Sequence, residues 1–229
     1  WDYFVVDSEE AVDRFATAFL IPHEKLIRTQ YPRVDRVMRR SADPELREDL
    51  RRAIGGNGET KLVLYAPTWR DHNFPVSPDE HDYSYLIDSE MLSDQLGPGF
   101  RLLVKDHDYL RPPSRTRIPH INDASEWDIE DLLVAADVLI TDYSSIAFDA
   151  ISRDLPVVWY ASDLPRFEES RGIYDDSFQR HNGFAGLDQS SLAELIVASL
   201  DPNKRQQPPT IDRGLRNTDL RGLLLRSHA

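Results

Sequence analysis

Residues 131–154, DLLVAADVLITDYSSIAFDAISRD, decide the fold of this chain. A short apolar run at residues 138–140 has the length that is typical of a buried parallel strand. The turn after it contains Ser144 and Ser145, which are favourable N-cap residues for a short helix with apolar residues on one side. The stretch therefore predicts a helix, a buried strand, a tight turn and a second helix, as in a parallel α/β sheet.

The turn at residues 142–145 is the first candidate for a binding site. It places two serine hydroxyls and the start of a helix just past the carboxyl end of the predicted strand. A helix N-terminus carries a partial charge of about +0.5 and attracts anions, and ligands of open α/β sheets sit at this edge. One interpretation is that Ser144 and Ser145 hold a phosphate; the other is that they are ordinary helix caps.

Strands and helices are predicted to alternate over residues 61–200. Apolar runs predict strands at residues 61–66, 100–104, 138–140 and 156–160, with a short one beginning near Ile121. Helices are expected at residues 85–96, 130–136 and 190–200, the last of them capped by Ser190. This alternation predicts an α/β fold with a Rossmann-like, doubly wound parallel sheet.

The residues before this sheet carry separate signals. Residues 1–6 are expected to form a strand, and Asp7 or Ser8 to cap a helix with apolar residues at helical spacing. Pro32 is expected to interrupt regular structure. Asp43 is expected to cap a polar helix that runs to about residue 54.

The composition describes a globular protein that is strongly acidic. The chain has 229 residues and a formal net charge of −13, from 27 basic and 40 acidic side chains. A nucleic-acid coat protein would need a basic face, so this class is excluded, whereas a nucleotide site needs only a few local cations. The absence of Cys excludes disulfides and thiolate metal sites. The first residue is Trp1 rather than Met, and we expect the chain to be a piece of a longer protein.

Four polar motifs stand directly after predicted strands. They occupy residues 67–71, 105–108, 142–145 and 163–167. Because the carboxyl ends of parallel strands meet at one edge of a sheet, these motifs are expected to converge on a single site.

Six motifs follow one another along the chain: TQYPRVD at residues 29–35, LYAPTWRD at 64–71, LVKDHDYL at 103–110, DIEDLLVAADVLITDYSSIAFD at 128–149, LPVVWYASDL at 155–164 and RGIYDD at 171–176. In this order they resemble the CDP-glycerol glycerophosphotransferase family, the teichoic acid polymerases and primases. The resemblance covers about residues 1–200. The combination of APTWRD, ITDYSS and RGIYDD is specific, although none of the three is specific alone.

The resemblance implies the C-terminal domain of a GT-B type, glycosyltransferase-like fold. Residues 1–40 are then a strand and helix leading in from an N-terminal domain that is largely absent. Residues 41–200 form the nucleotide-binding domain. Residues 201–229 are a tail that reads as a basic amphipathic helix, which either touches anionic lipid or packs its leucines on protein.

The reaction implied by the family is transfer of glycerol phosphate, or a related polyol phosphate, from a CDP-activated donor to a hydroxyl of a growing teichoic-acid-like or capsule polymer. CMP is released, and no cofactor or metal is implied. The acceptor is a polyol-phosphate polymer or a lipid-linked molecule, and the location is the cytoplasmic side, at the inner face of the cell membrane. The alternatives are an NDP-sugar glycosyltransferase domain of GT-B fold and a non-catalytic nucleotide-binding module. Glycerol, ribitol and sugar phosphate donors stay open, as do the primase and polymerase roles.

His107 and Arg70 are the candidate catalytic residues. His107 follows a strand end and matches the motif histidine of the family, where a cationic imidazole would stabilise the phosphate in the transition state. The family usually has Pro after this histidine, whereas here Asp108 follows it and Asp106 precedes it, and both carboxylates would favour its protonated form. The alternative for His107 is a surface histidine paired with one of these aspartates.

Arg70 presents a fork of donors that suits a phosphate or the acceptor chain, and its alternative is a salt bridge to Asp71 or to acids of the following loop. The candidate donor-binding residues are Thr68, Asp142, Ser144, Ser145, Asp149, Arg171 and Asp175. Asp149 stands four residues after Ser145 and is expected to hold that serine or a nearby arginine. For Arg171 and Asp175 the family suggests contact with the polyol or ribose, and the alternative is a structural pair.

The polar loop at residues 72–82 is either a surface excursion or a lid over the acceptor side. His72 and His81 lie in it among carboxylates, but their spacing matches no recognisable metal-ligand pattern, so no metal site is expected.

Overall fold

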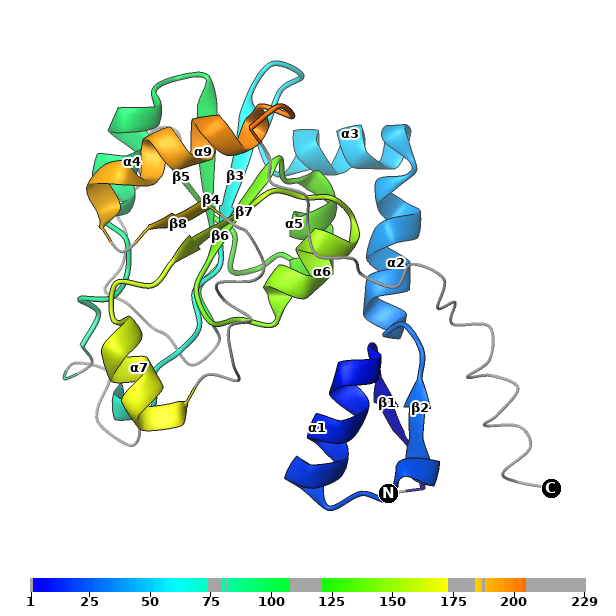
Figure 1. The fold of residues 1–229 in the computed structure, drawn as a ribbon. Coiled ribbons are helices and arrows are strands. Elements are labelled where there is room, and N and C mark those ends of the chain that lie inside the picture. The colour runs from blue at the N-terminus through cyan, green and yellow to red at the C-terminus, as the bar shows by residue number, and fades with distance from the viewer. Residues whose placement is uncertain are drawn as a thin grey trace.

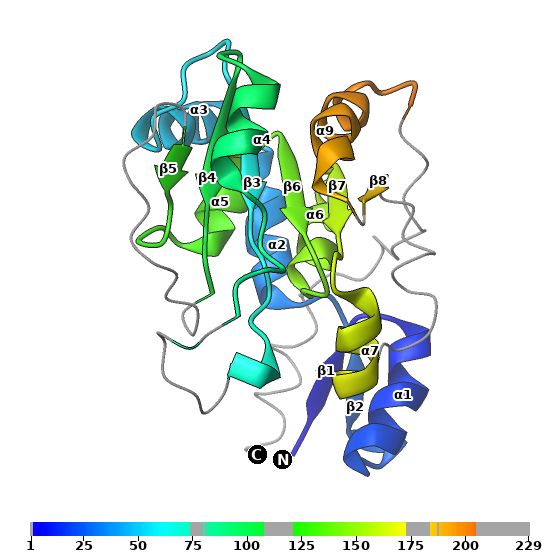
Figure 2. The ribbon, with the colours of Figure 1, turned by 90° about the vertical axis from the view of Figure 1, so that its left-hand side faces the viewer.

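The computed structural model describes residues 2–73, 80, 82–107, 121–172, 184–186 and 188–204. This part of the chain forms a six-stranded sheet covered by helices and a separate two-stranded unit at the N-terminal end (Figures 1 and 2). In the part described, no helix combines the length and the apolar character that crossing a bilayer requires.

The large sheet has the predicted α/β, doubly wound architecture. Its strands are β3 (Lys61–Tyr65), β4 (Phe100–Val104), β5 (Ile121–Asp123), β6 (Val138–Thr141), β7 (Val157–Tyr160) and β8 (Phe184–Gly186). They lie in the order β5-β4-β3-β6-β7-β8, and every neighbouring pair is parallel. The chain thus builds outward from β3 in one direction and from β6 in the other, which is the strand order of a Rossmann fold. The switch point between β3 and β6 is where such folds bind ligands.

Side chains of β3 alternate between the two faces of the sheet, as the period of two requires. Leu62 and Leu64 pack into the core on one face, and Val63 and Tyr65 into the core on the other. Both faces are therefore buried, which explains why the sequence of this strand reads as an unbroken apolar run rather than an alternating one.

Helices cover both faces. One layer contains α2 (Pro32–Ser41), α3 (Pro44–Ala53), α5 (Ile129–Ala135) and α6 (Ile146–Ser152), and the other contains α4 (Ser89–Leu96) and α9 (Leu192–Leu200). The helix α7 (Leu164–Arg171) follows β7 and lies beyond the carboxyl ends of the strands (Figure 1). Neither α7 nor β8 was expected from the sequence.

Three helix starts show how the local signals act. Asp43 caps α3 as predicted, accepting bonds from the backbone of Glu45 and Leu46, both at 3.1 Å. Pro32 was expected to interrupt regular structure, but it opens α2, because its missing N–H costs nothing in a first turn. The helix expected at residues 85–96 begins only at Ser89, where Asp88 caps it.

The N-terminal unit consists of β1 (Phe4–Val6), α1 (Glu9–Phe19) and β2 (Leu26–Arg28). The two strands are parallel and pair with one another rather than with the large sheet. Ser8 caps α1 as predicted, through a 3.1 Å bond from the Ala11 N–H. The unit joins the rest of the chain through α2 (Figures 1 and 2).

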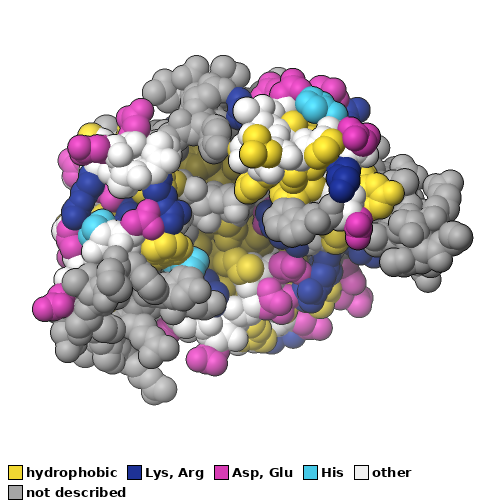
Figure 3. Space-filling model, turned by 90° about the horizontal axis from the view of Figure 1, so that it is seen from below, with side chains coloured by type: hydrophobic (Ala, Val, Ile, Leu, Met, Phe, Trp, Pro, Cys, Tyr) yellow, Lys and Arg dark blue, Asp and Glu magenta, His cyan; other side chains and the backbone are white. Residues whose placement is uncertain are grey.

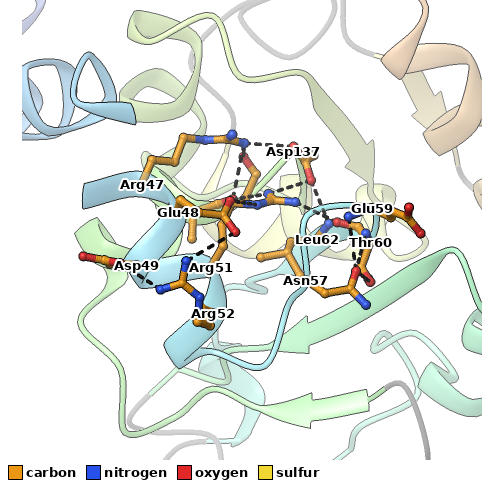
Figure 4. Close-up of polar contacts among 12 residues, drawn as sticks. Arg47, Glu48, Asp49, Arg51, Arg52, Asn57, Glu59, Thr60, Leu62 and Asp137 are labelled. Carbon is orange, nitrogen blue, oxygen red and sulfur yellow. Dashed lines mark hydrogen bonds and ion pairs between the residues drawn. The ribbon is translucent and has the colours of Figure 1, made fainter. Parts of the chain in front are cut away.

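An ionic network anchors α3 at the amino edge of the sheet (Figure 4). Asp137 stands directly before β6, and its carboxylate accepts Nη2 of Arg47 at 2.9 Å and Nη1 of Arg51 at 2.8 Å. The same carboxylate accepts the N–H of Leu62 at 2.8 Å. Arg51 also donates to the Ala135 carbonyl at 2.8 Å, and Nη2 of Arg47 donates to the same oxygen at 3.5 Å, so both arginines serve an acceptor at the end of α5. The network ties α3, the end of α5 and two strands together.

Replacement of the central carboxylate should destabilise the fold. Burial alone would raise the pKa of Asp137, but the bonds from Leu62 and Arg51 outweigh burial and hold this pKa below its usual value. We predict that Asp137→Asn lowers the free energy of unfolding in urea by about 3 kcal/mol, because two arginines lose their shared anion.

The pH dependence checks the same prediction. Since the pKa of Asp137 is depressed in the folded state, its stabilisation is present at neutral pH and is lost as the pH falls from about 4 through the folded-state pKa. The variant should therefore lose less stability than the parent over this window. Asp49→Asn, which removes the exposed partner of Arg52 on the same helix, is the control and should change stability by under about 0.5 kcal/mol. Equal effects of the two substitutions would contradict the anchoring role.

Candidate active site

The polar motifs that follow the strands meet at the carboxyl edge of the large sheet. Figure 3 shows the molecule from this side, where the surface is hollowed near its middle and hydrophobic side chains are visible inside the hollow. The segments after β3, β6 and β7 lie at this edge, as predicted for a doubly wound sheet.

Arg70 joins three of these segments. Its side chain is 3% exposed, and it forms two bonds to Asp163, from Nε at 2.7 Å and from Nη2 at 3.0 Å. Nη1 lies 2.9 Å from Oδ2 of Asp142 and donates to the Thr68 carbonyl at 2.8 Å. We call Arg70 with Asp142 and Asp163 the Arg70 clamp. It fixes the end of β3 to the ends of β6 and β7.

Aromatic rings enclose the guanidinium of the clamp. Its Cζ atom lies 4.2 Å from the ring centroid of Tyr85, 4.9 Å from that of Tyr143 and 5.2 Å from that of Phe167. Tyr143 and Phe167 also stack on each other with centroids 3.7 Å apart, and the Tyr143 hydroxyl donates to Oδ1 of Asp163 at 3.1 Å. Cation–π attraction is strongest where water is excluded, so the rings stabilise the buried cation.

The two carboxylates of the clamp have different electrostatic environments. Burial raises the pKa of Asp142, although Arg70 and the N–H of Thr68 favour its charged form. Burial also acts on Asp163, but there the bonds from Arg70 and from the Tyr143 hydroxyl outweigh it and lower the pKa. Two acids thus share one guanidinium, and the bonds from Arg70 favour the charged form of both carboxylates.

Arg70 is therefore placed differently from the sequence expectation. Its predicted salt-bridge alternative named Asp71 or the acids of the following loop, whereas its partners are Asp142 and Asp163. Four bonds of the guanidinium are directed to these acids and to Thr68, which favours a role in holding the site over direct contact with a phosphate.

The turn with the two serines lies beside the clamp. Ser144 Oγ accepts the N–H of Ile146 at 3.4 Å, as a helix cap does. Ser145 occupies the N-cap position of α6, but its side chain makes no capping bond and is exposed. Thr68 is joined to the start of this turn, because its N–H donates to both oxygens of Asp142, at 2.9 and 3.1 Å. Its Oγ1 is buried, and within the described part of the chain no group bonds to it.

Asp149 connects α6 to α2. Nε of Arg33, in the first turn of α2, donates to both of its oxygens at 2.9 and 3.2 Å. The sequence left open whether Asp149 holds Ser145 or an arginine, and the partner is Arg33. Burial raises the pKa of Asp149, with Arg33 as the main opposing influence.

Trp69, His107 and Arg171 form a second group at this edge. The guanidinium of Arg171 lies 4.5 Å from the ring centroid of Trp69, and the ring of His107 lies 6.3 Å from Trp69 at an inclination of 49°. Arg171 forms two bonds to Asp71, one of them from Nη2 to Oδ1 at 2.6 Å. The predicted partner Asp175 and the neighbour Asp108 lie outside the described residues, so the expectations for them are untested.

Sequence reasoning missed several of these residues. Asp163 lay in a motif of the expected site but had no role, and Trp69 stood unremarked between Thr68 and Arg70. Tyr85 and Arg33 gave no chemical signal, because the sequence does not show which side chains from distant segments meet. For metal binding, no cluster of three or more His, Asp or Glu ligands exists among residues 2–73, 82–107, 121–172 and 188–204.

Comparison with known proteins gives a consistent family. The chain matches the family described as CDP-Glycerol:Poly(glycerophosphate) glycerophosphotransferase over residues 1–211. A teichoic acid poly(glycerol phosphate) polymerase of Staphylococcus epidermidis is 30% identical over 217 residues, which cover 93% of this chain and 30% of that protein. A teichoic acid glycerol-phosphate primase of Bacillus subtilis is 30% identical over 208 residues, covering 89% of this chain and 51% of that protein. The chain thus spans about half, or less, of these relatives.

Solved structures with a similar fold include those of a wall teichoic acid polymerase. A histidine variant of the wall teichoic acid polymerase TagF superposes with a TM-score of 0.79 at 25% identity, covering 99% of this chain and 58% of that one. A UDP-GlcNAc 2-epimerase from Neisseria meningitidis superposes with a TM-score of 0.54 at 12% identity, covering 98% and 61%, which shows a shared fold alone. The predicted GT-B-like, Rossmann-type architecture is confirmed.

Removal of the clamp cation should be costly. We predict that Arg70→Met lowers the free energy of unfolding in urea by about 3 kcal/mol or more, because Asp142 and Asp163 stay buried without their cation. Arg70→Lys should recover only part of the loss, since a single ammonium cannot reproduce the planar fork. Arg166→Met is the control, because Arg166 pairs with Asp82 at 2.8 Å on the exposed side of α7 and should contribute at most about 1 kcal/mol. A lysine variant as stable as the parent would show that charge alone suffices.

Proposed function

The chain belongs to the CDP-glycerol:poly(glycerophosphate) glycerophosphotransferase family, and we propose that it is the donor-binding domain of such an enzyme. The proposed reaction transfers glycerol phosphate from CDP-glycerol to a hydroxyl of a growing teichoic-acid-like polymer and releases CMP. The observation that carries the proposal is the serine turn at the sheet's switch point, with His107 at the same carboxyl edge. Relatives named as glycerol-phosphate polymerases and primases support the substrate class, as does a TagF variant soaked with CDPG.

In this proposal the donor's diphosphate lies against the start of α6. Ser144 and Ser145 donate hydroxyl protons to phosphate oxygens, and the positive end of the helix adds to the attraction. The exposed side chain of Ser145, which makes no capping bond, supports this role. Thr68, whose N–H donates to Asp142 at the start of this turn, is proposed as a further residue of the donor site.

The buried acids and arginines of the site hold it in place. Arg70 and Asp142 fix the serine turn through the clamp, and Asp149 fixes α6 to α2 through Arg33. Arg171 reaches the site through Asp71 and Trp69, and Asp175 is proposed, on the family motif alone, to contact the polyol or ribose.

His107 is proposed as the catalytic residue. An acceptor hydroxyl attacks the β-phosphorus, the bond from that phosphorus to the bridging oxygen breaks, and CMP leaves with the electron pair. A protonated imidazole beside the phosphate stabilises the charge that develops on the oxygens. The general base that takes the hydroxyl proton is proposed to come from an N-terminal domain, of which residues 1–40, with β1, α1 and β2, form the last part.

The acceptor and the cellular location are proposed on the family resemblance. The acceptor is proposed to be a polyol-phosphate polymer or a lipid-linked molecule, and the enzyme to work at the inner face of the cell membrane. The tail beyond residue 204, which was expected to be a basic amphipathic helix, lies outside the described residues.

Nucleotide binding tests the proposed donor site. We expect calorimetric titration to show binding of CDP in preference to UDP, and Ser145→Ala to weaken CDP binding by about tenfold, the effect of one hydrogen bond to a charged group. Ser152→Ala is the matched control at the other end of α6, where the hydroxyl is bonded to the Phe148 carbonyl at 2.8 Å. Preference for UDP, or equal weakening by both substitutions, would favour an NDP-sugar enzyme or another site.

Turnover tests the catalytic role. In the full-length protein, His107→Ala should lower kcat for CDP-glycerol by about 10²- to 10³-fold, because charge stabilisation in the transition state is lost. CDP affinity should change little. A variant that keeps its turnover would remove His107 from the mechanism, and a parent protein that binds CDP without any turnover would favour a non-catalytic module.

A further inference from the structure

The segment after β3 directs successive side chains to opposite sides. Arg70 points into the protein, where it is 3% exposed and bonded within the clamp. Trp69 and Asp71, on either side of it, are both in contact with Arg171. Neighbouring residues of this segment therefore serve two purposes at once, with Arg70 bonded inside the protein and Trp69 and Asp71 both against Arg171. The inward residue holds the fold, and the outward pair faces the site.

Trp69 is held in place by a closed set of contacts. Arg171 lies over its ring with Cζ 4.5 Å from the centroid, within the range of a cation–π interaction. The same guanidinium is oriented by two bonds to Asp71, two residues further along the segment. The last residue of α7 therefore packs on the indole while it is bonded to the indole's own loop, and a turn of the ring would break the contact with Arg171.

The indole reaches from this support to His107. The two ring centroids lie 6.3 Å apart with the planes inclined by 49°, a separation and tilt typical of interacting aromatic pairs. His107 stands three residues beyond the end of β4, whereas Trp69 follows β3, so the contact bridges two neighbouring strand ends.

We propose that Trp69 is a positioning residue for His107, and that Arg171 and Asp71 act on the imidazole through it. This rests on the proposed function, in which His107 stabilises the transferred phosphate. A histidine on a strand-end loop needs a rigid neighbour to keep its imidazole within reach of the phosphate, and a misplacement of about 1 Å can cost on the order of 10²-fold in rate. In this proposal Arg171 contributes to the site by holding the Trp69 ring, and it does not contact the donor.

The first arm of the test measures the contact itself. NMR spectra of the parent, Trp69→Phe and Trp69→Leu should be compared for the imidazole protons of His107, identified by the peak that His107→Gln removes. Because an aromatic ring shifts the resonances of nearby protons, we expect a clear change in Trp69→Leu and a smaller one in Trp69→Phe. The imidazole resonances of His23, on the N-terminal unit, serve as the internal control and should stay unchanged. If the chemical shifts of the His107 imidazole protons are the same in Trp69→Leu as in the parent, the proposal is overturned.

The second arm measures the consequence in the full-length protein with CDP-glycerol. Trp69→Leu should lower kcat on the order of tenfold to a hundredfold and leave KM for the donor within about twofold, since the interaction is realised in the transition state. Trp69→Phe should recover most of the rate, which a merely structural role would not explain. Arg171→Met should lower kcat, but by less than Trp69→Leu does. Arg166→Met, on the same helix, should leave kcat unchanged.

The two arms separate this proposal from the function on which it rests. A parent protein without turnover, whose His107 resonances nevertheless respond to Trp69→Leu, would refute the proposed function and with it the positioning role, while the contact itself would stand. Normal turnover by the parent with equal kcat in Trp69→Leu would refute the positioning role alone.

Discussion

One buried guanidinium holds the functional edge of this protein together. Arg70 forms bonds to acids at the ends of β6 and β7 while its own backbone follows β3, so three strand ends depend on a single side chain. The hydrogen bonds between strands hold the backbone only within the sheet, so the loops beyond the strand ends need another constraint. The Arg70 clamp provides it and thereby sets where the serine turn lies relative to the neighbouring motifs. The rings of Tyr85, Tyr143 and Phe167 exclude water from the cation, which strengthens each of its bonds.

Arginine serves architecture throughout the described part of this acidic chain. Along α2 and α3, arginines pair with carboxylates of α5, α6 and the residue before β6: Arg33 with Asp149, Arg36 with Glu130, Arg40 with Asp131, and Arg47 and Arg51 with Asp137. The helices that connect the N-terminal unit to the large sheet are therefore attached by ion pairs as well as by the apolar side chains of Val37, in the core, and of Leu50, which packs against it. In the proposed function a phosphate at the carboxyl edge is met by hydroxyls, a helix terminus and an imidazole, because Arg70 is already bonded to the two acids Asp142 and Asp163.

The sequence predicted the fold well where burial leaves a simple pattern. β3, β6 and β7 are buried on both faces over most of their length, as is β4 from Leu102 onward, so each contains an apolar run. The alternation of these runs with helices was sufficient to predict the doubly wound sheet. The convergence of strand-end motifs followed from topology alone. The partners within the site could not be read in the same way, since Arg70 and Asp163 are far apart in sequence and either could have bonded a nearer residue. Pro32 shows the same limit on a local scale, because a proline that ends regular structure and one that opens a helix look alike until the following turn is known.

In the proposed function, the Arg70 clamp builds a phosphate site at the turn of residues 142–145 without contacting the phosphate itself. A crystal structure of the full-length protein with CDP-glycerol tests this most directly. We expect the diphosphate to lie against Ser144 and Ser145 at the start of α6, with His107 beside it and with Arg70 still bonded to Asp142 and Asp163. A diphosphate bound elsewhere, or an Arg70 that releases its two acids to bind the phosphate, would contradict it.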